Sequence, residues 1–145
     1  MNLCENLLKY NIVFGRELII MDKKSTEIKK DFNIKKGDIF KVKLTNCNNS
    51  KFNGIKNAIV IQSHNKYFET IAIAVIDRDD SKEKIMRTRI KLNNKHYALE
   101  GENTVLVDQI KTVEKDSFIE KIGTLNFEDR KLLNEALLFE FGFIK

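Results

Sequence analysis

The sequence predicts a mostly β domain that ends in helices. Short apolar runs rich in β-branched residues recur between positions 39 and 112, which is typical of strands. A polar loop of ten residues, 45–54, separates the first two runs, and after position 115 the apolar residues recur at helical spacing. The chain has 145 residues, of which 42% are hydrophobic, so it is long enough for one domain with a real core.

The first part of the chain differs in pattern from the rest. Residues 1–34 show no clean apolar period, and residues 22–36 are rich in Lys, Asp, Ser and Thr, as in a linker or a short charged helix. We therefore predict an N-terminal extension over 1–34 and the domain proper over 35–145. Whether the extension covers a face of the sheet or is disordered is left open by the sequence.

Five strands are predicted, over residues 39–44, 56–62, 69–77, 85–92 and 104–112. In the third, both faces are apolar, which favours a central strand buried on both sides. The fourth alternates, which would place Arg87, Arg89 and Lys91 on one face.

Two helices are predicted after the strands. The first would run over 115–122 and end at Gly123, a natural residue for a helix C-terminus. The second would be capped by Asn126, with two acidic side chains in its first turn. An apolar stripe of the second helix is expected to face the core, and it consists of Leu132, Leu133, Ala136, Leu137 and Phe141.

Several function classes are disfavoured. There is no apolar run long enough for a transmembrane helix and no secretory signal pattern, so a cytoplasmic protein is expected. Cys4 and Cys47 have neither CxxC spacing nor a nearby His cluster, which indicates free thiols. No metal site and no cofactor are expected.

The net charge is +5, and its distribution says more than its total. Residues 37–112 carry 13 basic and 9 acidic side chains, whereas residues 113–145 carry 5 and 7. A cationic surface attracts a phosphate backbone without reading its sequence, although a solvated strand face is the plainer interpretation. The densest basic patch consists of Lys82, Lys84, Arg87, Arg89, Lys91 and Lys95.

Three strings carry a family resemblance. They are KGDIFKVKL at 36–44, GIKNAIVIQ at 54–62 and VLVDQIKT at 105–112. In this order and spacing, followed by a helical tail, they resemble the MazF/PemK family of toxin endoribonucleases over about residues 35–143. The resemblance implies a small SH3-like barrel with a packed terminal helix, a homodimer, and the toxin of a type II toxin-antitoxin system. It also implies cleavage of single-stranded RNA without a metal, by attack of the 2′-OH on its own phosphate, and inhibition by a short acidic antitoxin.

The resemblance also suggests where the chemistry lies. Lys56 and Asn57 stand where the family usually has Arg and Pro, and Asp77 stands where it usually has Thr. Lys56 and Asp77 are therefore the expected catalytic residues, although Lys lacks the planar fork of Arg. Asp77 could act as a general base, repel the phosphate, or form an ion pair with Lys56 that quiets both. The expected substrate-binding residues are Ser50, Lys51, Asn53, Asn57, Gln62, Arg78 and Lys111.

Asp108 is a further candidate, because a carboxylate inside an apolar strand needs a partner. A structural role as a hydrogen-bond acceptor is the preferred interpretation. One branch of the family uses an Asp here with an Arg two residues before it, but this chain has Leu106 at that position.

Two function classes follow. The first is an active endoribonuclease toxin. The second is a barrel that has lost or repurposed its site and acts as a nucleic-acid or protein binding module, which the departures at Lys56 and Asp77 favour.

Overall fold

The structure is a computed structural model, and it describes residues 33–63, 68–78, 86–93 and 95–145. These belong to a compact unit that begins at Asn33. The predicted extension over 1–34 lies outside the described residues except for its last two, so the boundary at 34/35 stays a prediction. Within the unit, Ile34 is already buried, at 2% exposure.

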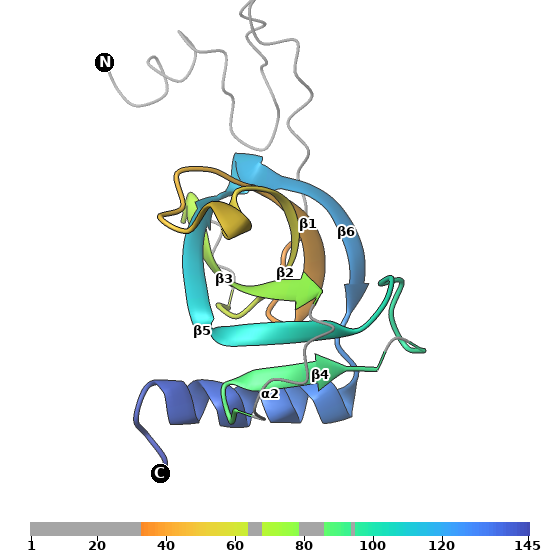
Figure 1. The fold of residues 1–145 in the computed structure, drawn as a ribbon, viewed down its shortest axis with the longest axis vertical. Coiled ribbons are helices and arrows are strands. Elements are labelled where there is room, and N and C mark those ends of the chain that lie inside the picture. Colours follow the sequence, from red (N-terminus) through yellow and green to blue (C-terminus); the bar gives the residue numbers. More distant parts are fainter. Residues whose placement is uncertain (1–32, 64–67, 79–85, 94) are drawn as a thin grey trace, which may run out of the picture. The chain divides into compact units, whose positions relative to one another are not determined.

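The described strands form one antiparallel sheet of six strands in the order β4-β5-β3-β2-β1-β6. The sheet curls into a barrel, and α2 lies along β4 (Figure 1). A mostly β fold with a C-terminal helix is thus confirmed. The elements are β1 (Asp38–Leu44), η1 (Ser50–Phe52), β2 (Gly54–Val60), β3 (Thr70–Arg78), β4 (Arg89–Leu92), β5 (Asn103–Glu114), η2 (Lys115–Ser117), β6 (Phe118–Thr124) and α2 (Phe127–Glu140).

The five predicted strands are all present, with ends shifted by a few residues. β3 lies in the interior of the sheet and is buried along most of its length, as its apolar sequence predicts. β4 is shorter than predicted because a turn precedes it, in which Arg89 donates its backbone N–H to the carbonyl of Met86 at 3.0 Å. Residue 85, the predicted start of this strand, lies outside the described residues.

The predicted helix over 115–122 is wrong. Only the short η2 forms there, and the chain then continues as β6, which pairs with the outer edge of β1. Phe118 is 4% exposed and packs edge-on against Phe40 with ring centroids 5.1 Å apart. Burial of this ring and completion of the β1 ladder outweigh the helical pattern, and Gly123 lies within β6 opposite Ile39.

The second predicted helix is α2, and Asn126 caps it as expected. The Oδ1 atom of Asn126 accepts a hydrogen bond from the backbone N–H of Asp129 at 2.8 Å. The inward stripe is only partly correct, because Leu133 and Ala136 are buried while Leu132 and Phe141 are 46% and 61% exposed. The helix packs mainly along β4 and β5, and this narrow contact leaves the flanking apolar side chains outside.

Cross-strand pairing assigns side chains to two faces of the sheet. One face, here called the helix face, packs against α2 through Ile39, Ile59 and Ile76 among others. The other, here called the Phe40 face, carries Phe40 and its neighbours across the sheet. That second row is buried and consists of Phe40, Ala58, Val75 and Leu106.

The turn that opens β1 explains the Gly-Asp pair of the sequence. Gly37 has φ +92°, a conformation that favours glycine. Asp38 is 2% exposed and accepts hydrogen bonds from the backbone N–H of Lys35 and from the Thr124 hydroxyl, both at 2.9 Å. The Lys121 ammonium lies 3.3 Å from the same carboxylate, so this buried charge is well satisfied and ties β6 to β1.

In the ranges that the structure describes, no helix combines the length and the apolar character that crossing a membrane requires.

Candidate functional site

The register brings four polar side chains into one row at the end of the Phe40 face. Lys91 lies opposite Thr104, and Thr104 lies opposite Asp77. Asn57 lies opposite Ile76 on the helix face, so their neighbours Lys56 and Asp77 are adjacent on the Phe40 face. We call Lys56, Asp77, Thr104 and Lys91 the rim row. The two expected catalytic residues are therefore brought together.

The partner of Asp77 comes from the loop between β1 and β2. The Lys51 Nζ atom lies 2.6 Å from Asp77 Oδ2, and the two side chains are 58% and 14% exposed. Lys51 is part of η1, which Asn49 caps by accepting the backbone N–H of Lys51 at 3.0 Å. Phe52, 6% exposed, anchors this turn in the core. The loop is thus held by the burial of Phe52 and tied to β3 by the ion pair between Lys51 and Asp77.

This pairing bears on one alternative left open by the sequence, because the salt-bridge partner of Asp77 is Lys51 and not Lys56. Asp77 is neutralised by Lys51, and the Lys56 side chain forms neither a salt bridge nor a hydrogen bond with the described residues. The ammonium group of Lys56 remains available to a ligand, whereas the ion pair with Lys51 makes the Asp77 carboxylate a weaker proton acceptor.

A third lysine reaches the same face from β5. Lys111 lies opposite Ile73, which shares the Phe40 face with Val75, and its Nζ lies 5.5 Å from the centroid of the Phe52 ring. The Lys51 Nζ lies 6.0 Å from the same ring. Lys51 and Lys111 therefore both lie near the Phe52 ring, and Lys51 also contacts Asp77.

The remaining expected substrate-binding residues lie elsewhere or have structural contacts. Asn57 is on the helix face, opposite Ile76. Asn53 Oδ1 accepts the backbone N–H of Cys47 at 2.8 Å, and the Ser50 carbonyl accepts the backbone N–H of Asn53 at 3.1 Å. The Gln62 side chain extends the β-ladder, because its Oε1 accepts the backbone N–H of Ala72 at 2.9 Å. Any role of these four residues in binding RNA stays a prediction.

Arg78 follows Asp77 in β3 and lies opposite Asn103, so it belongs to the helix face. Its guanidinium rests against Gly101, where an added Cβ would be only 2.6 Å from Nε. Gly101 also has φ +70°. A larger residue at 101 would displace Arg78, so this glycine fixes the course of the Arg78 side chain.

Sequence reasoning missed an Arg–Asp couple next to the rim row. Leu106 lies directly opposite Arg89 on β4, and the Arg89 Nη2 atom lies 3.7 Å from Asp108 Oδ2. An arginine thus lies across the strand pair from position 106, where the sequence itself has Leu. Asp108 Oδ1 is buried and accepts no hydrogen bond from the described residues. The only sequence signal was the alternation that placed Arg89 and Lys91 on one face.

The site therefore offers ammonium and guanidinium groups, one hydroxyl and two carboxylates on the rim of a barrel. Such a set binds polyanions and can move protons. Among the residues that the structure describes, no group of three or more His, Cys, Asp or Glu side chains is arranged to hold a metal ion.

The fold and this cationic rim define a small β-barrel protein suited to a phosphate-bearing ligand. Residues 35–141 match the family described as "PemK-like, MazF-like toxin of type II toxin-antitoxin system". The chain belongs to this family. A protein named "Endoribonuclease MazF" from Staphylococcus saprophyticus is 29% identical over 111 residues, which are 75% of this chain and 92% of that protein.

Solved structures show the same fold. A crystal structure of MazF from Deinococcus radiodurans aligns with a TM-score of 0.62 at 14% identity, covering 77% of this chain and 99% of that one. A mycobacterial endoribonuclease solved in complex with its cognate antitoxin aligns with a TM-score of 0.60 at 15% identity, covering 77% and 97%.

Proposed function

We propose that this chain is a metal-independent endoribonuclease that cleaves single-stranded RNA and acts as the toxin of a type II toxin-antitoxin pair. Membership of the PemK/MazF family supports the class. The observation that carries the proposal to this chain is the placement of Lys51 and Lys56 next to Asp77, with Lys111 farther along the same face of the barrel.

The proposed reaction uses few groups. The phosphate displaces Asp77 from Lys51, and the released carboxylate accepts the proton of the ribose 2′-OH. The 2′ oxygen attacks phosphorus, and the bond to the 5′ oxygen breaks. Lys56 donates a proton to that oxygen, so the products are a 2′,3′-cyclic phosphate and a 5′-OH. Lys51 and Lys111 offset the charge that develops on the phosphorane.

The test is incubation of a long single-stranded RNA with the full chain in chelator, followed by mapping of the new ends. We expect 5′-OH ends and at least about 100-fold slower cleavage by Lys56→Ala, the scale of losing one charged stabiliser or acid. Lys43→Ala is the matched control. Lys43 of β1 lies opposite Ile55 of β2. Because Ile55 and Lys56 are adjacent in β2 and point to opposite faces, the Lys43 side chain is on the other face from Lys56. Intact RNA after long incubation with folded protein would defeat the proposal.

A second candidate function is a silenced barrel that binds nucleic acid, RNA or DNA, or protein without cutting. The ion pair between Lys51 and Asp77 favours it, because an engaged carboxylate is a poor base. In this case the wild-type chain would retain RNA on a filter without cleaving it. The double variant Lys56→Arg, Asp77→Thr would then gain cleavage.

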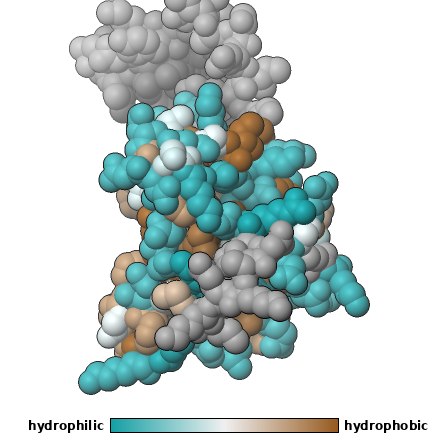
Figure 2. Space-filling model, viewed as in Figure 1, coloured by the Kyte–Doolittle hydropathy of each residue, from teal (hydrophilic) through white to brown (hydrophobic). Residues whose placement is uncertain are grey.

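We also infer a homodimer. Large apolar side chains are exposed at the end of α2 and beyond, including Leu138 at 43%, Phe141 at 61% and Phe143 at 76%. Figure 2 shows apolar side chains gathering around this end of α2 on an otherwise largely hydrophilic face. A symmetric dimer would bury them. Light scattering at tens of micromolar should give twice the monomer mass, and a monomer mass would refute the dimer.

The proposed partners are single-stranded RNA and a short acidic antitoxin. The proposed location is the cytoplasm, because the proposed substrate, single-stranded RNA, is found there. The cationic excess over residues 37–112 suits both partners.

A further inference from the structure

In the part of the chain that the structure describes, one edge of the sheet is open where β4 ends it. There β4 pairs with β5 only, and it is the outermost strand of the sheet. Val107 donates its backbone N–H to the Thr88 carbonyl at 2.9 Å. Bonded and non-bonded pairs alternate in an antiparallel ladder, so Ile90 and Leu92 bond to β5. The N–H and C=O of Lys91 therefore point away from β5, toward the open edge.

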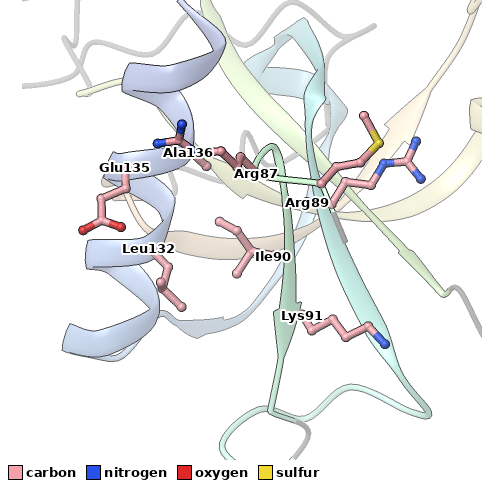
Figure 3. Close-up of a pocket in the computed structure, with 8 residues that line it drawn as sticks. Arg87, Arg89, Ile90, Lys91, Leu132, Glu135 and Ala136 are labelled. Carbon is pink, nitrogen blue, oxygen red and sulfur yellow. The ribbon is translucent and has the colours of Figure 1, made fainter. Parts of the chain in front are cut away.

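A groove runs between this edge and α2. It has a volume of about 290 Å³ and is bounded on α2 by Leu132, Glu135 and Ala136. Residues from both faces of β4 line it, which places it at the strand edge rather than over one face. In Figure 3, Ile90 points toward α2, whereas Lys91 points to the opposite side of β4. The groove thus combines an apolar wall with backbone groups of Lys91 that no described strand pairs.

The charged groups around the groove are mostly cationic. Arg87, Arg89 and Lys91 line it together with one carboxylate, that of Glu135, and Arg89 also lies 3.7 Å from Asp108, which does not line the groove. The Arg87 guanidinium lies 4.2 Å from the centroid of the Phe139 ring, which holds it at the groove. Lys91 is 3.9 Å from Glu102 with both side chains about two-thirds exposed, so this contact is easily exchanged.

We propose that an extended acidic segment of the antitoxin binds here by adding a strand to β4. This proposal deepens the proposed function and rests on it for the class of the partner. An extended peptide satisfies the backbone of an open edge, and its alternate side chains supply specificity. The basic side chains that line the groove favour an acidic segment as the occupant. They disfavour the chain's own first 36 residues, which carry 8 basic and 5 acidic side chains.

The register sets the pattern of the bound segment. Side chains directly opposite Arg89 and Lys91 would lie on the Phe40 face and should be acidic. The side chain between them would lie opposite Ile90, facing Leu132 and Ala136 on α2, and should be apolar. The segment therefore reads acidic, apolar, acidic at successive positions.

The test uses a blocked, fluorescein-labelled heptapeptide, Ser-Glu-Leu-Glu-Leu-Glu-Ser, titrated into the full chain by fluorescence anisotropy. We expect saturable binding below about 1 mM, a range suited to a short peptide held by few contacts. The same peptide with Lys in place of Glu, and one N-methylated at alternate amides, should each bind at least about tenfold more weakly. Amide exchange should show new protection of Lys91.

Two variants distinguish the contribution of backbone hydrogen bonding to peptide binding from the contribution of the Lys91 charge. Lys91→Pro removes the outward N–H, a change that an edge position tolerates, and Lys91→Ala removes the charge alone. We expect Lys91→Pro to bind at least about threefold more weakly than Lys91→Ala. If circular dichroism shows that Lys91→Pro is unfolded, the N-methylated peptide makes the same test on the wild type.

Three results would overturn the proposal: no saturable binding, equal binding of the N-methylated peptide, or new amide protection confined to regions other than β4. Protection of Lys91 that rises with protein concentration alone would also overturn it, because a second copy would then occupy the groove. RNA cleavage by the same sample is scored separately. A chain that cuts RNA without binding the peptide refutes only this proposal, and one that binds without cutting refutes only the enzyme.

Discussion

Removing the Tyr97 hydroxyl should destabilise the fold measurably. Tyr97 donates its O–H to Asp129 Oδ2 at 2.6 Å and accepts the backbone N–H of Asn126 at 3.0 Å. These bonds fasten the segment before β5 to the first turn of α2. A hydrogen bond to a charged group contributes about 1.5–3 kcal/mol, and an N–H left without a partner costs about 1–3 kcal/mol. Because Tyr97 is only partly buried, water can take over part of the lost hydrogen bonding. Tyr97→Phe should therefore lower the free energy of unfolding by about 2–3 kcal/mol.

Urea unfolding at pH 7.5 measures that cost, and its pH dependence supplies a second check. Burial, reinforced by the hydrogen bond to Asp129, raises the pKa of Tyr97 from 10.0 to about 12. The folded state therefore holds this proton more tightly than the unfolded state does. The stabilisation is complete below pH 10 and is lost as pH rises from 10 to 12. The difference between wild type and Tyr97→Phe should shrink over that range. A cost below about 0.5 kcal/mol at pH 7.5, or a difference that grows with pH, would refute the reasoning.

Three other changes test the packing and the site. Phe118→Ala should cost about 3–5 kcal/mol in urea unfolding, because it leaves a cavity against Phe40; a cost under 1 kcal/mol would mean that β6 is not anchored there. Lys56→Arg should cleave RNA at least as fast as the wild type in initial-rate assays, because Arg grips two phosphate oxygens, and a loss as large as that of Lys56→Ala would contradict a charge-stabilising role. Asp77→Asn should slow cleavage about 100-fold or more if its carboxylate is the base, and faster cleavage would show that Asp77 only restrains Lys51.

Elements whose structure follows from the residues of their own segment could be predicted from the sequence. β3 has β-branched or small apolar side chains at nearly every position, so burial on both faces follows from composition alone. The Asn126 cap of α2 is a local hydrogen bond, and it was predictable for the same reason.

β6 was not predictable in this way. Phe118–Thr124 contains Glu120, Lys121 and Gly123, and neither period dominates. The segment becomes a strand because β1 offers an open edge and Phe40 offers a partner for the Phe118 ring. These are long-range contacts, invisible in a local window.

The candidate site was likewise predictable only in part, and the part that was missed depends on long-range contacts. Placement of Lys56 and Asp77 on one face follows from two adjacent strands in register, so it could be anticipated. The partner of Asp77 could not, because it depends on how the loop before β2 folds and where η1 places Lys51. The contact between Arg89 and Asp108 likewise required the register of β4 on β5.

The most direct test of the central claim removes a single oxygen atom, the 2′ oxygen at the cut site, from the RNA substrate. Once a cut has been mapped in a long RNA, two oligonucleotides of that sequence are compared in chelator, one all-ribose and one with a single deoxyribose on the 5′ side of the cut. Attack by the 2′-OH predicts cleavage of the first, with a 2′,3′-cyclic phosphate, and no cleavage of the second at that position. Equal cleavage of both would contradict the account.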